Sequence, residues 1–278
     1  MGANLAKDID SLEKKGRIPQ TVRLDVKSKN LGNIPHNINK LTALEYLNAS
    51  YNSISNLPPE IGQLRKLKEL NLCSNRLTVL PGEITTLLEL ERMILSCNKL
   101  KTLPRGFGAY NKLTTLDLSY NDLEEITPQI GLLSTLRDFY CSWNKLTTLP
   151  PDIGRCLCLQ KLVLENNKID ILPEDLGKCT SLRELDLRFN DIYLLPPDLG
   201  KCPALNKVQL SANKEIHKGI DTEAKRGQSA LIDYFGTDEY AALYRDAKSN
   251  GSLDKRHNDN VAKGKGGKKN QKKDKDKK

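Results

Sequence analysis

Apolar residues recur along most of the chain in a frame of fixed length. In LEYLNASYN, which runs from Leu44 to Asn52, apolar residues take the first, fourth and sixth places and an asparagine takes the ninth. This alternation predicts a short strand with one buried face. The period predicts an array of stacked units, because no single unit could bury its apolar face alone. The frame returns every 23 residues, with its asparagine at Asn52, Asn75, Asn98, Asn121, Asn144, Asn167, Asn190 and Asn213.

The full unit, LEYLNASYNSISNLPPEIGQLRK from Leu44 to Lys66, has the pattern of a leucine-rich repeat. One earlier frame, with Lys29 in the place of the asparagine, brings the number of frames to nine. We expect an α/β fold, a leucine-rich-repeat solenoid (horseshoe) with a parallel concave β-sheet. The asparagine amides are expected to satisfy backbone groups inside each bend. Thr127 stands where most units have a proline, and a local irregularity is expected there.

The ends of a solenoid would expose leucines unless other segments covered them. Leu5, Ile9 and Leu12 lie at helical spacing near the N-terminus, and residues 223–248 contain further apolar positions at helical spacing. The residues after about 249 are almost all polar, which is typical of disorder. We therefore expect an N-terminal helical cap over residues 1–21, the solenoid over 22–213, a C-terminal helical cap over 214–248 and a disordered, lysine-rich tail over 249–278.

The only tryptophan, Trp143, belongs either to a core or to a binding surface. In the repeat frame, the residues six, four, two and one before each asparagine are expected to face out of the sheet. Trp143 and Tyr120 occupy the last of these columns on adjacent coils, and Tyr140 lies in the column four before the asparagine. Because adjacent strands are about 4.8 Å apart, we expect the three rings to form one patch on the concave face.

Aromatic and acidic residues on this face are the candidate protein-binding residues. Tyrosine and tryptophan are enriched in binding hot spots, and carboxylates beside them suit a basic or apolar segment of a partner. The alternative interpretation is that the rings only cover the sheet between strands. The candidates are Tyr51, Asp117, Tyr120, Asp138, Tyr140, Trp143, Glu165, Asp186 and Phe189.

No constellation in the sequence predicts catalysis. The three histidines are far apart, and the repeated Ile-Gly pairs do not form a phosphate loop. Cys156, Cys179 and Cys202 recur at the repeat period and could be zinc ligands. They occupy a core column without a fourth ligand, so buried thiols are the favoured interpretation. We expect no enzyme activity, no cofactor and no metal.

The formal net charge of +9 is concentrated at one end of the chain. Residues 249–278 hold ten Lys, one Arg and four Asp, which accounts for +7 of it. The repeats therefore lack a broad basic face, and binding of nucleic acid is not expected. The lysines of the tail allow weak contact with an anionic membrane, offset by the aspartates. A tail that is merely solvated is the other interpretation.

The N-terminus and the cysteines indicate the compartment. MGANLAKDIDSL contains charges and lacks the apolar segment of a signal peptide, and no apolar run approaches the roughly 20 residues that span a bilayer. Seven cysteines are an odd number, which favours free thiols over a disulfide framework. We expect a cytoplasmic monomer with a protein partner.

The unit LPxxIGxLxxLxxLxLxxN resembles the Ras-group leucine-rich-repeat proteins, which include Ras suppressor protein and the plant intracellular Ras-group proteins. LPRGFGAYNKLTTLDLSYNDL and LIDYFGTDEYAALY are similar to stretches of the former, whereas the junction NKEIHKGID lacks the group's asparagine-proline pair. The resemblance implies a non-enzymatic scaffold in Ras-type small-GTPase or adhesion-linked signalling. The alternatives are a peripheral membrane adaptor that uses the basic tail, and a regulatory subunit of an enzyme such as a phosphatase or ubiquitin ligase.

Overall fold

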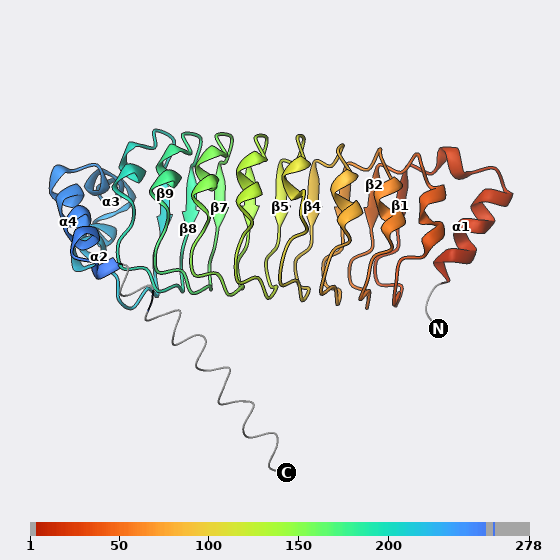
Figure 1. The fold of residues 1–278 in the computed structure, drawn as a ribbon, viewed down its shortest axis with the longest axis horizontal. Coiled ribbons are helices and arrows are strands. Elements are labelled where there is room, and N and C mark those ends of the chain that lie inside the picture. Colours follow the sequence, from red (N-terminus) through yellow and green to blue (C-terminus); the bar gives the residue numbers. More distant parts are fainter. Residues whose placement is uncertain (1–3, 254–257, 259–278) are drawn as a thin grey trace, which may run out of the picture.

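Nine short strands form one parallel sheet in the structure, a computed structural model that describes residues 4–253 and 258. Each strand pairs with the next one along the chain, and partners are 23 residues apart, as Asp138 and Lys161 are. Figure 1 shows the coils side by side in sequence order. The predicted solenoid is thereby confirmed. The strands are β1 (Arg23–Asp25), β2 (Tyr46–Asn48), β3 (Glu69–Asn71), β4 (Arg92–Ile94), β5 (Thr115–Asp117), β6 (Asp138–Tyr140), β7 (Lys161–Val163), β8 (Glu184–Asp186) and β9 (Lys207–Gln209).

The return segment of each coil contains a short 3₁₀ helix. A proline in extended conformation precedes most of these helices; Pro150, with φ −66° and ψ 143°, is one example. Thr127 takes the place of this proline in one coil, and its side-chain oxygen accepts a hydrogen bond from the Gln129 N–H at 3.3 Å. The helix that follows is five residues long, like most of the others, so the irregularity expected at Thr127 is absent. Within residues 4–253 the 3₁₀ helices are Ile18–Gln20, His36–Lys40, Pro59–Gln63, Gly82–Thr86, Phe107–Ala109, Pro128–Leu132, Pro151–Arg155, Glu174–Lys178 and Pro197–Lys201.

The asparagine amides satisfy backbone groups of the bend, as predicted, and they also connect neighbouring coils. The Asn121 side-chain oxygen accepts a hydrogen bond from the Leu100 N–H at 2.9 Å. Its amide nitrogen donates to the carbonyls of Leu95 and Leu118 at 3.0 and 2.9 Å. Leu95 and Leu100 belong to the preceding coil, so a single buried amide satisfies backbone groups of two coils.

Each strand is only three residues long, which corrects part of the prediction about outward columns. The residues six and four before each asparagine lie in the strand, whereas those two and one before it lie in the turn that follows. The chain bends there because the asparagine amide binds carbonyls two and three residues earlier, as Asn121 binds those of Ser119 and Leu118. Serines two before the asparagine are buried, contrary to the prediction: Ser50, Ser96, Ser119 and Ser142.

Helices cover both ends of the solenoid. Helix α1 (Leu5–Lys14) buries Leu5 and Ile9 against the first coil. At the other end lie α2 (Lys218–Arg226), α3 (Gln228–Phe235) and α4 (Asp238–Ser249). The Tyr240 hydroxyl from α4 donates to the Leu195 carbonyl at 2.7 Å and accepts from the Leu195 N–H at 3.0 Å, which joins this cap to the last coils. No helix among the described residues is long and apolar enough to cross a membrane.

The stretch predicted to be a disordered tail begins with packed residues. Helix α4 extends to Ser249, and Leu253 is only 4% exposed. Residues 254–257 and 259–278 lie outside the described residues, and the disorder predicted for them is not tested. The folded part of the chain therefore extends at least five residues beyond the predicted boundary.

Candidate functional site

Tyr120 and Trp143 form a stacked aromatic pair on the surface. Their ring centroids are 5.3 Å apart and their planes differ by 10°. The two residues occupy the same place on adjacent coils, and the Tyr120 N–H donates to the Ser142 carbonyl at 2.8 Å, which holds the coils in register there. Tyr120 is 50% exposed and Trp143 is 45% exposed. Trp143 is therefore a surface residue, at the turn beyond the strand rather than in the sheet.

The backbone at both rings is left-handed, with φ of 56° at Tyr120 and 55° at Trp143. The equivalent residue of every coil has this conformation, including Ser28 and Ala212, so it is a property of the fold. In this conformation a bulky side chain costs more conformational energy than asparagine or glycine. The backbone therefore gives no reason for a tyrosine and a tryptophan at these positions.

Tyr140 lies in strand β6 and does not join the stacked pair. Its ring lies 5.8 Å from the Lys161 ammonium, and within the described residues it makes no ring contact with Tyr120 or Trp143. Burial raises the pKa of Tyr140, and the nearby Asp138 carboxylate raises it further. The predicted patch of three rings is thus a stacked pair with a separate, half-buried tyrosine between acidic groups.

Asp117 and Asp138 flank Tyr140 on the strand face. Asp117 lies opposite Tyr140 in the pairing of β5 with β6, and its carboxylate accepts a hydrogen bond from the Ser119 N–H at 2.9 Å. Neither carboxylate forms an ion pair with a lysine or arginine of residues 4–253, although the charge of Asp138 contributes to the raised pKa of Lys161. Both are half-buried. They leave negative charge beside aromatic surface.

The acidic residues of the next coils are already paired. Arg188 contacts the Glu165 carboxylate at 3.0 Å and the Asp186 carboxylate at 2.7 Å. Glu184 lies between Lys161 at 3.0 Å and Lys207 at 2.8 Å. The sequence interpretation missed these cations, although Lys161, Glu184 and Lys207 share one column and Glu165 and Arg188 share another. Opposite charges one repeat apart were the signal that could have identified them.

Two predicted site residues lie away from the pair, and one is inaccessible. Tyr51 lies three coils before Tyr120 in the same column, with the Lys27 ammonium 5.0 Å from its ring. Phe189 lies two coils beyond Trp143. Asp186 is only 3% exposed because Arg188 covers it, so the prediction that it faces a partner is wrong. Five candidates lie on the coils of β5 and β6, the stacked pair in the turns and the other three in the strands. We call these five the aromatic–acidic patch: Asp117, Tyr120, Asp138, Tyr140 and Trp143.

The three cysteines that recur at the repeat period belong to the hydrophobic core. The Cys156, Cys179 and Cys202 thiols are buried and donate to main-chain carbonyls of the preceding coil at 3.2–3.3 Å. Burial raises the pKa of Cys156 to about 11 and that of Cys179 to about 12, so neither is a ready thiolate ligand. No group of three or more potential metal ligands occurs among the described residues.

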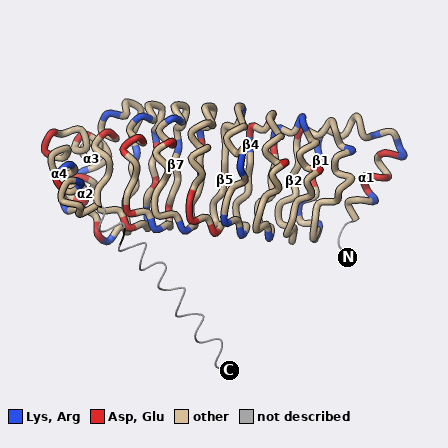
Figure 2. Tube along the Cα trace, in the orientation of Figure 1, with Lys and Arg blue, Asp and Glu red and all other residues tan. Residues whose placement is uncertain are grey.

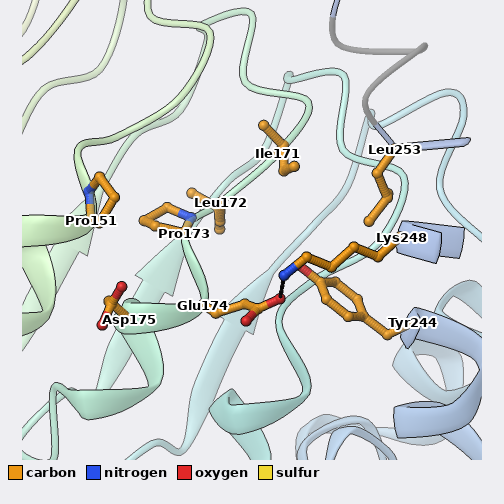
Figure 3. A pocket seen from close by; sticks show the side chains of 9 residues that line it. All are labelled: Pro151, Ile171, Leu172, Pro173, Glu174, Asp175, Tyr244, Lys248 and Leu253. Atoms are coloured by element: carbon orange, nitrogen blue, oxygen red, sulfur yellow. Dashed lines mark hydrogen bonds and ion pairs between the residues drawn. The ribbon is translucent and has the colours of Figure 1, made fainter. Parts of the chain in front are cut away.

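A pocket of about 250 Å³ lies where the C-terminal cap meets the solenoid (Figure 3). Tyr244 and Leu253 line it from the cap, and Ile171 and Pro173 line it from a coil. The Lys248 ammonium binds the Glu174 carboxylate at 2.6 Å across one side of the pocket. The third charged residue of the lining, Asp175, forms an ion pair with Lys178.

Charges of both signs alternate along the solenoid, as Figure 2 shows. Lysines and arginines are interspersed with aspartates and glutamates on successive coils, and many of them pair. Much of the charge on these coils is therefore balanced between neighbouring coils.

Comparison with solved structures gives the same fold. A leucine-rich-repeat protein of Leptospira interrogans is 28% identical with a TM-score of 0.56, over 72% of this chain and 61% of that one. A TDR receptor is 23% identical with a TM-score of 0.55, over 74% of this chain and 44% of that one, which shows the fold alone. This chain thus spans less than two thirds of either protein. Comparison with curated proteins finds no match.

Family models of leucine-rich repeats match along the chain. A leucine-rich repeat region matches residues 24–150, and single leucine-rich repeats match residues 158–179 and 178–192. None of these is a catalytic family, and proteins of this fold typically mediate protein–protein interaction. Together the matches extend over more than half of the sequence, and they follow the same period as the strands and the asparagines. The chain belongs to the leucine-rich-repeat family.

Proposed function

We propose that this chain is a non-enzymatic scaffold that binds a protein partner through the aromatic–acidic patch. The observation that carries the proposal is the stacked, half-exposed pair of Tyr120 and Trp143 on the same two coils as Asp117 and Asp138, which form no ion pair with a lysine or arginine of residues 4–253. Exposed aromatic surface of this kind is uncommon away from binding sites. Tyrosine and tryptophan supply large contact area with few rotatable bonds, which is why they dominate hot spots.

The partner that fits this patch carries a basic side chain on an apolar segment. Asp117 and Asp138 attract a lysine or arginine, whereas the cations of the neighbouring coils are already bound to Glu165, Glu184 and Asp186. An arginine can also lie flat against the exposed face of Trp143. The patch therefore selects a partner by the position of one cation relative to apolar contacts.

The wider setting of this scaffold is proposed from the sequence. The resemblance to Ras-group proteins in LPRGFGAY and LIDYFGTDEYAALY supports a role in Ras-type small-GTPase or adhesion-linked signalling. Seven cysteines without a disulfide fit a reducing compartment such as the cytoplasm. We further propose that the chain acts as a monomer. A membrane contact through the basic tail would involve residues outside the described ones.

Trp143→Asn is expected to weaken binding of the partner by about 2 kcal/mol, or roughly 30-fold in Kd, because it removes the stacked hot spot. The fold should tolerate the change, since Asn166 has the same left-handed conformation one coil away, with φ 58°. The measurement is affinity capture from cells that express the protein, with wild type and variant compared by quantitative mass spectrometry, followed by titration of the captured partner.

Tyr51→Asn is the matched control, because Tyr51 has the same column, conformation and exposure but lies three coils from the pair. A protein that is lost from Trp143→Asn and retained by Tyr51→Asn supports the proposal. An identical set of captured proteins for both variants and wild type would contradict it, and would leave the rings as cover for the sheet.

Asp138→Asn tests the basic side chain of the partner. This substitution removes one half-buried charge and nearly preserves the shape of the side chain. It is expected to weaken binding several-fold at low salt. The difference from wild type should shrink as salt rises, because exposed charges are screened. Titrations at two ionic strengths measure this, and a loss that is the same at both would show that the partner brings no cation to Asp138.

A further inference from the structure

Cys73 and Cys97 lie on adjacent coils beside the aromatic pair. Cys97 occupies the column of Tyr120 and Trp143, one coil before Tyr120, and has the same left-handed φ of 56°. Cys97 is exposed and Cys73 is partly exposed.

The coils hold these two residues one position out of register. The Ser74 N–H donates to the Ser96 carbonyl at 2.9 Å, and the Asn75 N–H donates to the Cys97 carbonyl at 3.1 Å. Cys73 therefore lies opposite Ser96 and diagonal to Cys97. A strand spacing of about 4.8 Å and a rise of about 3.3 Å place the two α-carbons about 6 Å apart. Disulfides span about 4.4–6.8 Å between α-carbons, so the backbone is already suited to one.

The two side chains share a neighbour. Besides burial, the Cys73 thiol raises the pKa of Cys97, and the Ser74 hydroxyl lowers it. The Cys73 sulfur lies 3.4 Å from the same hydroxyl, so all three groups form one cluster.

The other five cysteines do not form such a pair. Cys141, Cys156, Cys179 and Cys202 are buried, and Cys158 is exposed but has only the buried Cys156 as a thiol neighbour. Of the seven cysteines, only Cys73 and Cys97 combine a thiol neighbour on the adjacent coil with access to solvent for both members.

We propose that Cys73 and Cys97 are a reversible dithiol–disulfide site, oxidised by a low-molecular-weight disulfide of the glutathione type. The Cys97 thiolate attacks one sulfur of glutathione disulfide, which forms a mixed disulfide and releases one glutathione thiolate. The Cys73 thiolate then attacks the Cys97 sulfur, which forms the Cys73–Cys97 bond and releases the second glutathione. Two electrons pass from the protein to glutathione disulfide, and the two thiol protons end on two glutathione molecules.

The rate of this reaction should rise with pH. Burial raises the pKa of Cys97 above its usual range, and the neighbouring Cys73 and Asp117 raise it further. Only the thiolate attacks, so the rate increases about tenfold per pH unit below that pKa. The site is therefore slow to oxidise at neutral pH.

The test uses the full chain, incubated at several pH values with glutathione disulfide, quenched with an alkylating reagent and digested with trypsin. Mass spectrometry should then find the peptide of residues 69–76 joined to that of residues 93–99, minus two hydrogens. Reduced glutathione should reverse the link. Cys73→Ser and Cys97→Ser should abolish it, and Cys158→Ser should leave it unchanged.

Two results would overturn the proposal. One is a mixed disulfide with glutathione at Cys97 that persists while Cys73 stays reduced, which would show that the thiols cannot reach each other. The other is no oxidation of either residue under conditions that modify Cys158. The outcome does not depend on any partner at the aromatic–acidic patch. A negative result here would therefore leave the proposed function untouched, and the reverse also holds.

Discussion

Asn121→Ala is expected to lower the free energy of unfolding by about 4 kcal/mol, because the lost amide leaves buried backbone groups of two coils without partners. Its side chain binds one N–H and two carbonyls within 3.0 Å, and a longer contact of 3.3 Å joins the Ser119 carbonyl. Alanine can replace none of these bonds at a residue that is only 8% exposed. Urea unfolding followed by circular dichroism measures the change.

Asn56→Ala is the control for this prediction. Asn56 is exposed, and its side-chain nitrogen donates only to the neighbouring Ser55 hydroxyl at 3.1 Å. Its replacement should change the free energy of unfolding by no more than about 0.5 kcal/mol. If Asn121→Ala were as mild as Asn56→Ala, the asparagines would not hold the coils together, and the packing of leucines alone would have to do so.

Gly154→Ala is expected to lower the free energy of unfolding by about 2–3 kcal/mol through steric conflict between coils. A methyl group at Gly154 would lie 2.2 Å from the Asp175 carbonyl oxygen and 2.8 Å from its carbonyl carbon. These are main-chain atoms of the next coil, so a side-chain rotation cannot relieve the contact. The coils must move apart, and in a solenoid that weakens a nearest-neighbour interface on which both sides depend.

Gly82→Ala is the matched control, at the start of another 3₁₀ helix. A methyl group there meets nothing within 4 Å, and its backbone is not left-handed. We expect stability to be unchanged or to rise by up to about 1 kcal/mol, because alanine restricts the unfolded chain. Thermal and urea unfolding of both variants give the comparison. Equal stability of the two would show that the coils can shift freely at Gly154.

The candidate site followed from the sequence only in part. The repeat frame placed Tyr120 and Trp143 on adjacent coils, and the structure stacks them. The same frame put Asp186 on the surface, but Arg188 covers it. The repeat frame placed both Asp186 and Arg188 in outward positions. Such a position predicts only the direction in which a side chain leaves the backbone. Which charges pair depends on how long side chains bend across coils.

The sequence by itself determined the solenoid, its nine coils, its parallel sheet and the role of the asparagines. These features depend on a period of 23 residues and on the side on which apolar residues lie, and both are local properties of the chain. The tertiary structure decided where each strand ends, and it thereby moved Tyr120 and Trp143 from the sheet into a left-handed turn. It also decided that Tyr140 lies apart from them, that Leu253 packs on the cap and that Cys73 lies diagonal to Cys97 on the adjacent coil. The physical reason is that these contacts join residues of different coils, and their geometry exists only after the coils have stacked.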